Sequence, residues 1–280
     1  MLQVHNSNEL SAQIHDWKRQ GKTIAFVPTM GNLHEGHLSL LRIGREQADK
    51  LVSSIFVNPM QFGPNEDLNK YPRTLEQDCK ALMEHACDLV YLPTEQDLYP
   101  NGLTHVTSVH VPDITERFEG KFRPGHLDGV STIVLKLFNL VQPTIAVFGK
   151  KDYQQWRMIE KMVHDLNLPI DICAGETVRE DDQLAMSSRN QYLSEQERQN
   201  ASQLYRELSQ AAERLSSGQQ DIAAICLQAR ENLQRAGFEV DYFDICERTT
   251  LTPLSASPPA VIVAAARLGK TRLIDNIEVD

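Results

Sequence analysis

Two histidines three positions apart follow a short apolar run, within the segment Pro28-Thr-Met-Gly-Asn-Leu-His-Glu-Gly-His37. On a helical turn, residues three apart share a face, so His34 and His37 would present their imidazoles together. A helix N-terminus offers unpaired N–H groups and the positive end of the helix dipole, both of which suit phosphate. Gly31 and Gly36 permit close approach of the backbone to a ligand. The segment therefore predicts a phosphate-binding loop.

Two other interpretations of this histidine pair stay open. A metal site would need further ligands, and the spacing identifies no third His or Cys partner. A histidine at such a position can also be an ordinary turn residue whose hydrogen bonds are satisfied locally. The two glycines and the preceding apolar run favour phosphate binding over both.

A second segment, Phe148-Gly-Lys-Lys-Asp-Tyr-Gln-Gln155, again places a glycine and charged groups directly after an apolar run. Lys151 offers a point charge for phosphate. Asp152 is either the N-cap of the next helix or an acceptor for a ribose hydroxyl. Gln155, one turn further on, either binds a polar substrate or is solvated.

Two further segments carry polar groups on expected loops. Met186-Ser-Ser-Arg189 offers two hydroxyls and a guanidinium, which suit a triphosphate. Taken alone, Ser-Ser-Arg more often marks a solvated loop, but it lies near an expected domain boundary, and clefts between domains are preferred ligand sites. In Phe56-Val-Asn-Pro-Met-Gln-Phe62, Asn58 and Gln61 either face the same cleft or belong to an ordinary loop.

The elements that must position these residues alternate between apolar runs and amphipathic stretches. Short apolar strands separated by helices of about 12 residues are typical of βαβ units in a parallel sheet. Such sheets bind ligands at the carboxyl ends of their strands, where the first two segments are expected to lie. The expected strands are 23–27, 51–57, 88–92, 144–148 and 170–173. The expected helices are 7–20, 38–50, 74–86, 130–141 and 152–166.

The pattern changes after about residue 176. Two helices, 194–216 and 221–236, are expected before strands at 240–246, at 259–267 and near Leu273. Helices followed by strands, without alternation, indicate a separate α+β domain. The predicted fold class is therefore α/β: a Rossmann-like parallel-sheet nucleotide-binding domain at residues 1–176, followed by a smaller α+β domain at residues 177–280 that covers the site.

Composition narrows the functional class. The 280 residues carry 28 Lys and Arg against 38 Asp and Glu, a net charge of −10, which disfavours a nucleic-acid-binding surface. The longest apolar run, Ala260–Ala266, is far shorter than the roughly 20 residues of a membrane span, and the charged N-terminal stretch predicts no signal peptide. The five cysteines form no C-x-x-C pair and are expected to be free, mostly buried thiols of a cytoplasmic protein.

The chain resembles the pantoate–β-alanine ligase (pantothenate synthetase) family within the superfamily of nucleotidyltransferases with a His-x-Gly-His motif. The resemblance spans nearly the whole sequence, and its motifs occur in the family's order. They are Val27-Pro-Thr-Met-Gly-Asn-Leu-His-Glu-Gly-His37, Phe56-Val-Asn-Pro-Met-Gln-Phe62, Tyr71-Pro-Arg-Thr74, Arg123-Pro-Gly-His126, Lys151-Asp-Tyr-Gln-Gln155, Met186-Ser-Ser-Arg-Asn190 and Leu273-Ile-Asp-Asn276. One departure is Lys150, where the family usually has Glu or Gln.

The resemblance implies a role for each matched residue. The implied ATP-binding residues are Met30, Gly31, Asn32, Leu33, His34, Glu35, Gly36, His37, Gly149, Lys150, Lys151, Asp152, Val178, Met186, Ser187, Ser188 and Arg189. The implied catalytic residues are His37, His34, Lys151 and Arg189, with His37 as a proton donor or only a hydrogen-bond donor. Gln61 and Gln155 would bind pantoate, Gln61 would also lie beside β-alanine, and Asp78 is either associated with Mg²⁺ or a solvated helix residue.

The implied reaction is the ATP-dependent condensation of pantoate with β-alanine through a pantoyl adenylate, giving pantothenate, AMP and pyrophosphate. ATP would enter with Mg²⁺. The resemblance implies a cytoplasmic homodimer whose substrates are small molecules, with no nucleic-acid or membrane partner. Two alternatives stay open: an adenylyltransferase that leaves AMP on its product, and a nucleotide-binding module without catalysis.

Overall fold

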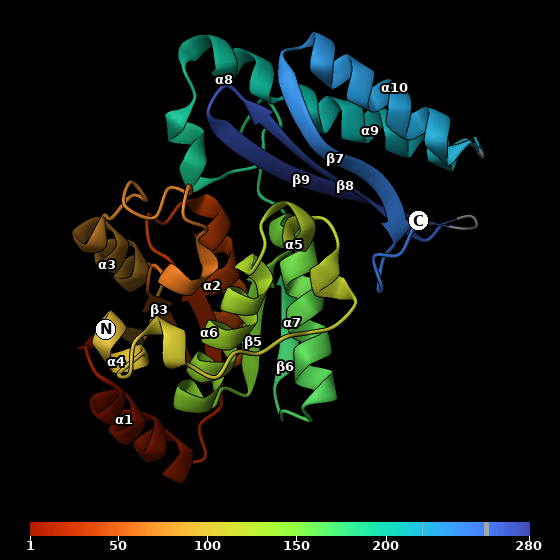
Figure 1. The fold of residues 1–280 in the computed structure, drawn as a ribbon. Helices are drawn as coiled ribbons and strands as arrows, with labels where there is room; N and C mark the ends of the chain where they lie inside the picture. The colour runs from red at the N-terminus through yellow and green to blue at the C-terminus, as the bar shows by residue number, and fades with distance from the viewer. Residues whose placement is uncertain (220, 255–257) are drawn as a thin grey trace. The chain divides into compact units, whose positions relative to one another are not determined.

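The computed structural model describes residues 1–219, 221–254 and 258–280 (Figure 1). The chain divides into two compact units, residues 1–150 with 158–176, and residues 151–157 with 177–280. The sequence prediction assigned residues 151–157 to the first domain. They group with the second unit because the Tyr153 hydroxyl donates to Glu278 Oε1 at 2.8 Å and the Asn276 amide donates to the Lys151 carbonyl at 3.0 Å.

The first unit is built on a six-stranded sheet in the order β1-β4-β3-β2-β5-β6, in which every neighbouring pair is parallel. Its strands are β1 Leu2–Val4, β2 Ile24–Thr29, β3 Lys50–Ile55, β4 Leu89–Tyr91, β5 Ile145–Gly149 and β6 Asp171–Gly175. The helices of this stretch of the chain are α1 Ser7–Arg19, α2 Glu35–Gln47, α3 Leu75–Glu84, α4 Glu95–Leu98, α5 Glu119–Phe122, α6 His126–Val141 and α7 Tyr153–Asp165. Short 3₁₀ turns are η1 Pro59–Gln61, η2 Leu103–His105, η3 Ile114–Glu116 and η4 Lys150–Asp152.

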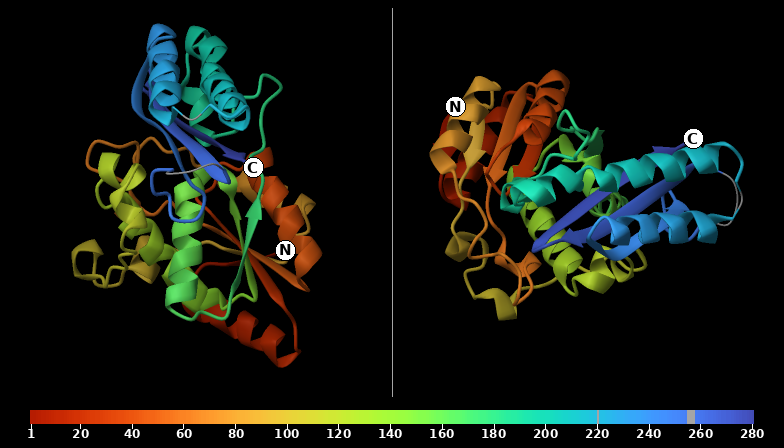
Figure 2. Two further views of the ribbon diagram at one scale, coloured as in Figure 1. Left: turned by 90° about the vertical axis from the view of Figure 1, so that its right-hand side faces the viewer. Right: turned by 90° about the horizontal axis from the view of Figure 1, so that it is seen from above.

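Helices cover both faces of this sheet because its central strands are apolar on both sides. Side chains alternate across a strand, so Ala25 and Phe26 face opposite sides of β2. Ala25 belongs to a buried cluster with Leu41 of α2, whereas the Phe26 ring packs edge-on against Phe138 of α6. The layered arrangement is visible in Figure 2.

The strand order reverses between β2 and β5, which are hydrogen-bonded neighbours with Phe26 opposite Ala146. From β2 the chain proceeds through β3 to β4 on one side, and then returns to β5 and β6 on the other. Such a reversal opens a crevice at the carboxyl ends of the two strands, where open α/β sheets bind ligands. The loops after β2 and β5 are the two segments that the sequence predicts for phosphate binding.

The second unit packs two long helices on a three-stranded antiparallel sheet, as Figure 1 shows. Its strands are β7 Phe238–Glu247, β8 Ala260–Leu268 and β9 Thr271–Val279, and its other elements are η5 Ser188–Tyr192, α8 Glu195–Ala201, α9 Gln203–Ser216 and α10 Ile222–Arg235. The core includes Leu208 of α9, Leu233 of α10 and Ile262 of β8, all fully buried. The α/β fold class predicted from the sequence is confirmed.

Several element predictions need correction. The expected helix 194–216 is two helices, because the chain departs from helical hydrogen bonding at Ser202. The φ of −66° and ψ of −13° at Ser202 stay close to helical values, so the apolar periodicity of the sequence continues across the break. Helices α2 and α6 begin three and four residues before the predicted Leu38 and Val130, at polar positions that carry no apolar signal. The strand β1 was missed because it has only three residues.

Two remaining expectations concern the cysteines and the membrane. Four cysteines are buried and Cys173 is partly buried, all with free thiols, as predicted. No helix within the described residues is long and apolar enough to cross a membrane.

Candidate active site

The loop between β2 and α2 is held in shape by one buried carboxylate. Asp78 of α3, only 2% exposed, accepts the backbone N–H of Asn32 at 2.9 Å and that of Leu33 at 2.8 Å. Gly31 has φ of +84°, and a Cβ there would lie 3.0 Å from Asp78 Oδ2, so glycine is required for both reasons. Asp78 therefore fixes the loop from Met30 to His34 at the carboxyl end of the central strand.

The histidine pair caps the first turn of α2. His34 is the N-cap, and its Nδ1 accepts the N–H of Gly36 at 3.2 Å, while Nδ1 of His37 accepts the N–H of His34 at 3.3 Å. A neutral imidazole nitrogen that accepts a hydrogen bond carries no proton, so both rings are assigned the tautomer with hydrogen on Nε2. The ring centroids lie 4.2 Å apart. Each histidine thus has an Nε2–H donor beside the positive end of the helix.

Gly36 is required by the same cap. A Cβ at this position would lie 2.9 Å from Cε1 of the His34 ring, which is closer than side chains normally approach. The ring could then no longer fold over the backbone to accept the Gly36 N–H. The sequence predicts that Gly36 allows a ligand to approach the backbone closely. In the structure this glycine allows the His34 ring to approach it.

Gln61, at the end of η1, is buried and hydrogen-bonded at both ends of its side chain. Its Oε1 accepts from Asn58 Nδ2 at 3.1 Å, and its Nε2 lies 3.2 Å from the sulfur of Met30. The structure therefore brings Gln61 together with the first residue of the loop that the sequence predicts for phosphate binding. Asn58, expected to face the same cleft, is itself 1% exposed and acts through Gln61.

A buried charged cluster fixes the backbone of Gln61. His126 Nδ1 lies 2.8 Å from the Gln61 carbonyl and therefore donates to it, while Arg123 lies 2.9 Å from Nε2 of the same ring. Arg123 also forms a bidentate ion pair with Glu66, with two contacts of 2.7 Å. Burial and the nearby Arg123 lower the pKa of His126 to about 4, so this imidazole stays neutral at pH 7. Sequence reasoning quoted the Arg123-Pro-Gly-His126 motif but gave neither residue a role.

After β5, the two adjacent lysines have different surroundings. Lys150, the departure from the family pattern, forms an ion pair of 2.6 Å with Glu176, so its extra charge is balanced locally. Lys151 keeps its Nζ 3.8 Å from Asp152 Oδ2, a looser contact. Gln155 lies on α7 and is partly buried.

In the second unit, the Met186-Ser-Ser-Arg189 segment is folded back on Val178. The Met186 N–H donates to the Val178 carbonyl at 3.0 Å, and Ser187 Oγ caps η5 by accepting the N–H of Arg189 at 3.2 Å. The neighbouring Arg179 holds Asp275 through two contacts, of 2.7 and 2.9 Å. The loop is therefore ordered by its own bonds and is not the solvated loop of the alternative interpretation.

The structure thus groups the predicted residues into two sets. The loop 30–37, Gln61, Asp78, Gly149 and Lys150 belong to the first unit, whereas Lys151, Asp152, Gln155, Val178 and 186–189 belong to the second. Asn276, whose amide binds the Lys151 carbonyl, is a positioning residue that sequence reasoning missed, although it lies in a quoted motif.

Asp78 does not fit as a direct magnesium ligand. Besides two backbone N–H groups it accepts the Thr74 hydroxyl at 3.2 Å, so hydrogen bonds use three of the roughly four lone-pair positions on its two oxygens. Magnesium needs carboxylate lone pairs in near-octahedral geometry. The alternative interpretation of Asp78 as a solvated helix residue is wrong, because its side chain is buried. Within the described residues, no group of three or more His, Cys, Asp or Glu side chains is arranged to hold a metal ion.

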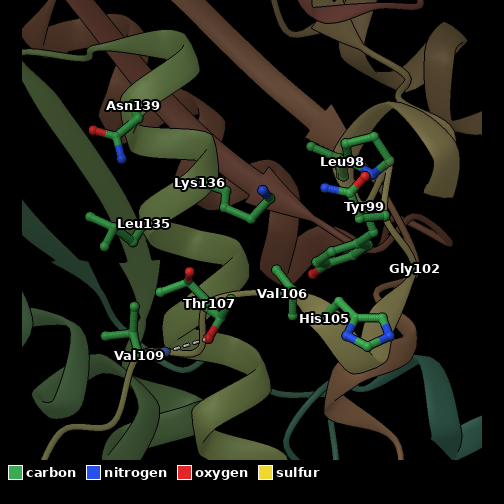
Figure 3. Close-up of a pocket in the computed structure, with 13 residues that line it drawn as sticks. Leu98, Tyr99, Gly102, His105, Val106, Thr107, Val109, Leu135, Lys136 and Asn139 are labelled. Carbon is green, nitrogen blue, oxygen red and sulfur yellow. Dashed lines mark hydrogen bonds between the residues drawn. The ribbon is translucent and has the colours of Figure 1, made fainter.

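A separate cavity of about 330 Å³ lies in the first unit, between the segment after β4 and α6 (Figure 3). Its wall includes Tyr99, His105, Val109, Thr132 and Lys136. None of the predicted site residues lines it. Its connection to the predicted site runs through Tyr99, whose hydroxyl reaches Asn58 at 2.7 Å.

The fold and the site define a class: a nucleotide-binding α/β enzyme whose phosphate loop follows a central strand at the switch point of the sheet. A family model described as pantoate-beta-alanine ligase matches residues 3–278. The chain belongs to the pantoate–β-alanine ligase family, and it is a ligase.

Similar proteins match this chain over nearly its whole length. Pantothenate synthetase of Aeromonas hydrophila subsp. hydrophila is 52% identical over 277 residues, which cover 99% of this chain and 97% of the relative. Pantothenate synthetase of Stutzerimonas stutzeri is 51% identical with the same coverage. Among solved structures, pantothenate synthetase from Thermus thermophilus has a TM-score of 0.93 at 43% identity, covering 99% of both chains.

A further solved structure was determined with ligands. Pantoate-beta-alanine ligase from Francisella tularensis, complexed with beta-gamma ATP and beta-alanine, has a TM-score of 0.84 at 32% identity and covers 99% of this chain and 97% of its own.

Proposed function

We propose that this chain condenses pantoate with β-alanine in a reaction driven by ATP. A pantoate carboxylate oxygen attacks the α-phosphorus of ATP, the bond from that phosphorus to the bridging oxygen breaks, and pyrophosphate leaves. The amine of β-alanine then attacks the carbonyl carbon of pantoyl adenylate, loses a proton and displaces AMP. Pantothenate is the product.

The observation that carries the proposal is the histidine cap on α2. Because Nδ1 of His34 and of His37 accepts a backbone N–H, a hydrogen of each ring is assigned to Nε2. Two such donors at a helix N-terminus stabilise negative charge that develops on phosphate oxygens. In this assignment His37 acts as a hydrogen-bond donor and does not transfer its proton.

The second unit supplies the permanent charges. Lys151 and the Arg189 guanidinium would balance the charge of the leaving pyrophosphate, with Ser187 and Ser188 as hydroxyl donors. No side chain forms a covalent bond to substrate. Catalysis therefore comes from holding the carboxylate in line with the α-phosphorus and from preorganised donors.

Gln61 and Gln155 would hold pantoate, with Gln61 also beside β-alanine. Gln61 is suited to this because its amide oxygen is already bound to Asn58, so its Nε2 remains the end that can donate to a hydroxyl or carboxylate. Gln155 of α7 is assigned to pantoate from the match of its motif, Lys151-Asp-Tyr-Gln-Gln155, to the family.

Magnesium, homodimer formation and a cytoplasmic location complete the proposal. Bound Mg²⁺ would neutralise phosphate charge, and it would enter with ATP. The free thiols suit a reducing compartment.

The test is an assay of the intact chain with ATP, Mg²⁺, pantoate and β-alanine. Pantothenate and AMP should form in equal amounts, and neither should form when either organic substrate is omitted. Without β-alanine, pantoate should support exchange of labelled pyrophosphate into ATP, because formation of the adenylate is reversible. Transfer of AMP to a stable product would indicate the adenylyltransferase, and ATP binding without turnover would indicate the non-catalytic module.

A further inference from the structure

The buried side chain of Asn58 uses all of its hydrogen-bonding groups. Its Oδ1 accepts from the Tyr99 hydroxyl at 2.7 Å and from the Met60 N–H at 3.4 Å. Its Nδ2 donates to the Gly129 carbonyl and to Gln61 Oε1, both at 3.1 Å. At 1% exposure, no water can replace a lost partner easily.

The Met60 N–H, which can only donate, and the Gly129 carbonyl, which can only accept, make the oxygen end of Asn58 distinct from its nitrogen end, and the Tyr99 hydroxyl anchors that oxygen. The Met60 contact is long, so the phenol is the strong donor to Oδ1. Burial raises the pKa of Tyr99, which keeps the hydroxyl protonated. If the Asn58 amide rotated, its NH₂ would face the Met60 N–H and its oxygen would face the Gly129 carbonyl.

The orientation of Asn58 sets that of Gln61. With Asn58 Nδ2 as a fixed donor, Gln61 must present Oε1 to it, which leaves Nε2 on the side of Met30. A flipped Gln61 would place its NH₂ against the NH₂ of Asn58 and present an oxygen to the substrate side. A carboxylate substrate would be repelled by that oxygen.

Two neighbouring side chains pack against the Tyr99 ring. Lys136 Nζ lies 5.5 Å from the ring centroid, and the centroid of the Phe56 ring lies 6.3 Å from it. Figure 3 shows the Lys136 side chain extending toward Tyr99. Tyr99 is 2% exposed, although one side of it borders the cavity. Packing therefore holds the hydroxyl in place without help from any substrate.

We propose that Tyr99 is a positioning residue that keeps Gln61 as a hydrogen-bond donor toward the carboxylate or hydroxyl of the acid substrate, acting through Asn58. This role rests on the proposed assignment of Gln61 to pantoate. In this role Tyr99 acts on the reaction by holding the Asn58 amide, and through it that of Gln61.

The test compares Tyr99→Phe with Tyr91→Phe. Tyr91 is an equally buried tyrosine of the first unit whose hydroxyl donates to Asp97, away from Asn58. Each variant loses one tyrosine hydrogen bond, a buried one to an amide in Tyr99→Phe and a part-buried one to a carboxylate in Tyr91→Phe, so both should fold with a loss of stability of at most a few kcal/mol. Only Tyr99→Phe should raise the KM for pantoate, and the rise should be about fivefold, which is the size expected for the loss of one hydrogen bond. Its KM for ATP should stay within twofold of the wild-type value.

A double variant separates positioning from general damage. Gln61→Ala alone should raise the pantoate KM, and adding Tyr99→Phe to it should change that KM by less than twofold, because no amide remains to be oriented. An additive fivefold rise in the Gln61→Ala background would overturn the role of Tyr99.

The remaining outcomes are distinct. If wild type forms no pantothenate, the proposed function is wrong. If wild type is active but Tyr99→Phe and Tyr91→Phe share one pantoate KM, the function stands and the role of Tyr99 is overturned. If Gln61→Ala leaves the pantoate KM unchanged, the assignment of Gln61 and the role of Tyr99 fail together.

Discussion

The two units hold their predicted site residues by different chemistry. In the first, neutral or anionic side chains bind loop backbone: Asp78 accepts two N–H groups, and His126 donates to the Gln61 carbonyl. In the second, an ion pair joins Asp275 to Arg179, the residue that follows Val178. The loops of the first unit are therefore ordered largely by hydrogen bonds to their backbone, with the Arg123–Glu66 ion pair behind them, and we predict that the second unit contributes fixed charge.

The histidines sharpen this difference. All nine precede residue 165, and none falls within residues 151–157 or 177–280. The second unit therefore contains no histidine, the side chain whose ordinary pKa lies near neutrality. The lowered pKa of His126 therefore belongs to the first unit.

Removing a fixed charge from the second unit should have the largest effect. Lys151→Ala should lower the rate of adenylate formation by about 10²–10³-fold, the scale for losing one preorganised electrostatic group. The measurement is pantoate-dependent exchange of pyrophosphate into ATP.

The adjacent lysine is the control for this prediction. Lys150→Ala should cost less than about tenfold, because Glu176 already balances that charge and a paired, partly exposed cation contributes little. Equal losses in the two variants would contradict the distinction between them, and near-normal exchange in Lys151→Ala would remove its catalytic role.

The second prediction concerns acid stability of the first unit. The pKa of His126 is about 4 in the folded chain and near 6.5 when unfolded, so the unfolded state binds more protons between these values. Stability from this group is then complete above pH 6.5 and is lost as the pH falls toward 4, by about 3 kcal/mol. Urea unfolding of wild type and of His126→Gln at pH 7 and pH 4 measures it.

The variant should have a shallower dependence on pH, because glutamine does not titrate. It should be less stable than wild type at pH 7, where the imidazole bridges Arg123 and the Gln61 carbonyl, and the gap should narrow toward pH 4. Parallel pH profiles of wild type and variant would show that His126 is not the group responsible.

The fold was predictable from sequence to the extent that its signals are local. The apolar runs at 23–27 and 144–148 lie in β2 and β5, and the glycines and charges after them mark the strand ends. The order of strands is not local, so the sequence could not show that β2 and β5 are neighbours at the switch point. The start of α2 was missed because it is set by a histidine cap, which has no apolar periodicity.

The positioning residues were the hardest part of the site to predict. Asp78 lies 46 positions from Asn32, and Asn276 lies 125 positions from Lys151, so each bond depends on tertiary packing. An aspartate on a helix pattern looks solvated whether or not a loop folds over it. The second unit's residues 151–157 were misassigned for the same reason, since Tyr153 reaches Glu278 across the chain.

The smallest expected effect comes from changing the carboxylate that shapes the phosphate loop. In Asp78→Asn one oxygen still accepts an N–H, but the new NH₂ faces another N–H donor, so one charge-assisted bond is lost at a cost of about 2 kcal/mol in stability. The KM for ATP should rise by about tenfold as the loop loosens. Because Asp78 is placed as a loop anchor and not as a metal ligand, the Mg²⁺ concentration that gives half-maximal activity should change less than twofold.

Asp88→Asn provides the matched control within the same unit. Asp88 also accepts a backbone N–H, that of Leu51 at 2.8 Å, but it precedes β4 at the amino ends of the strands, away from the phosphate loop. The Asp88→Asn variant should be less stable than wild type, and its KM for ATP should be unchanged. If Asp78→Asn instead raised the Mg²⁺ requirement severalfold and left stability at the wild-type value, Asp78 would be a metal ligand, and the first unit would contribute charge as the second does.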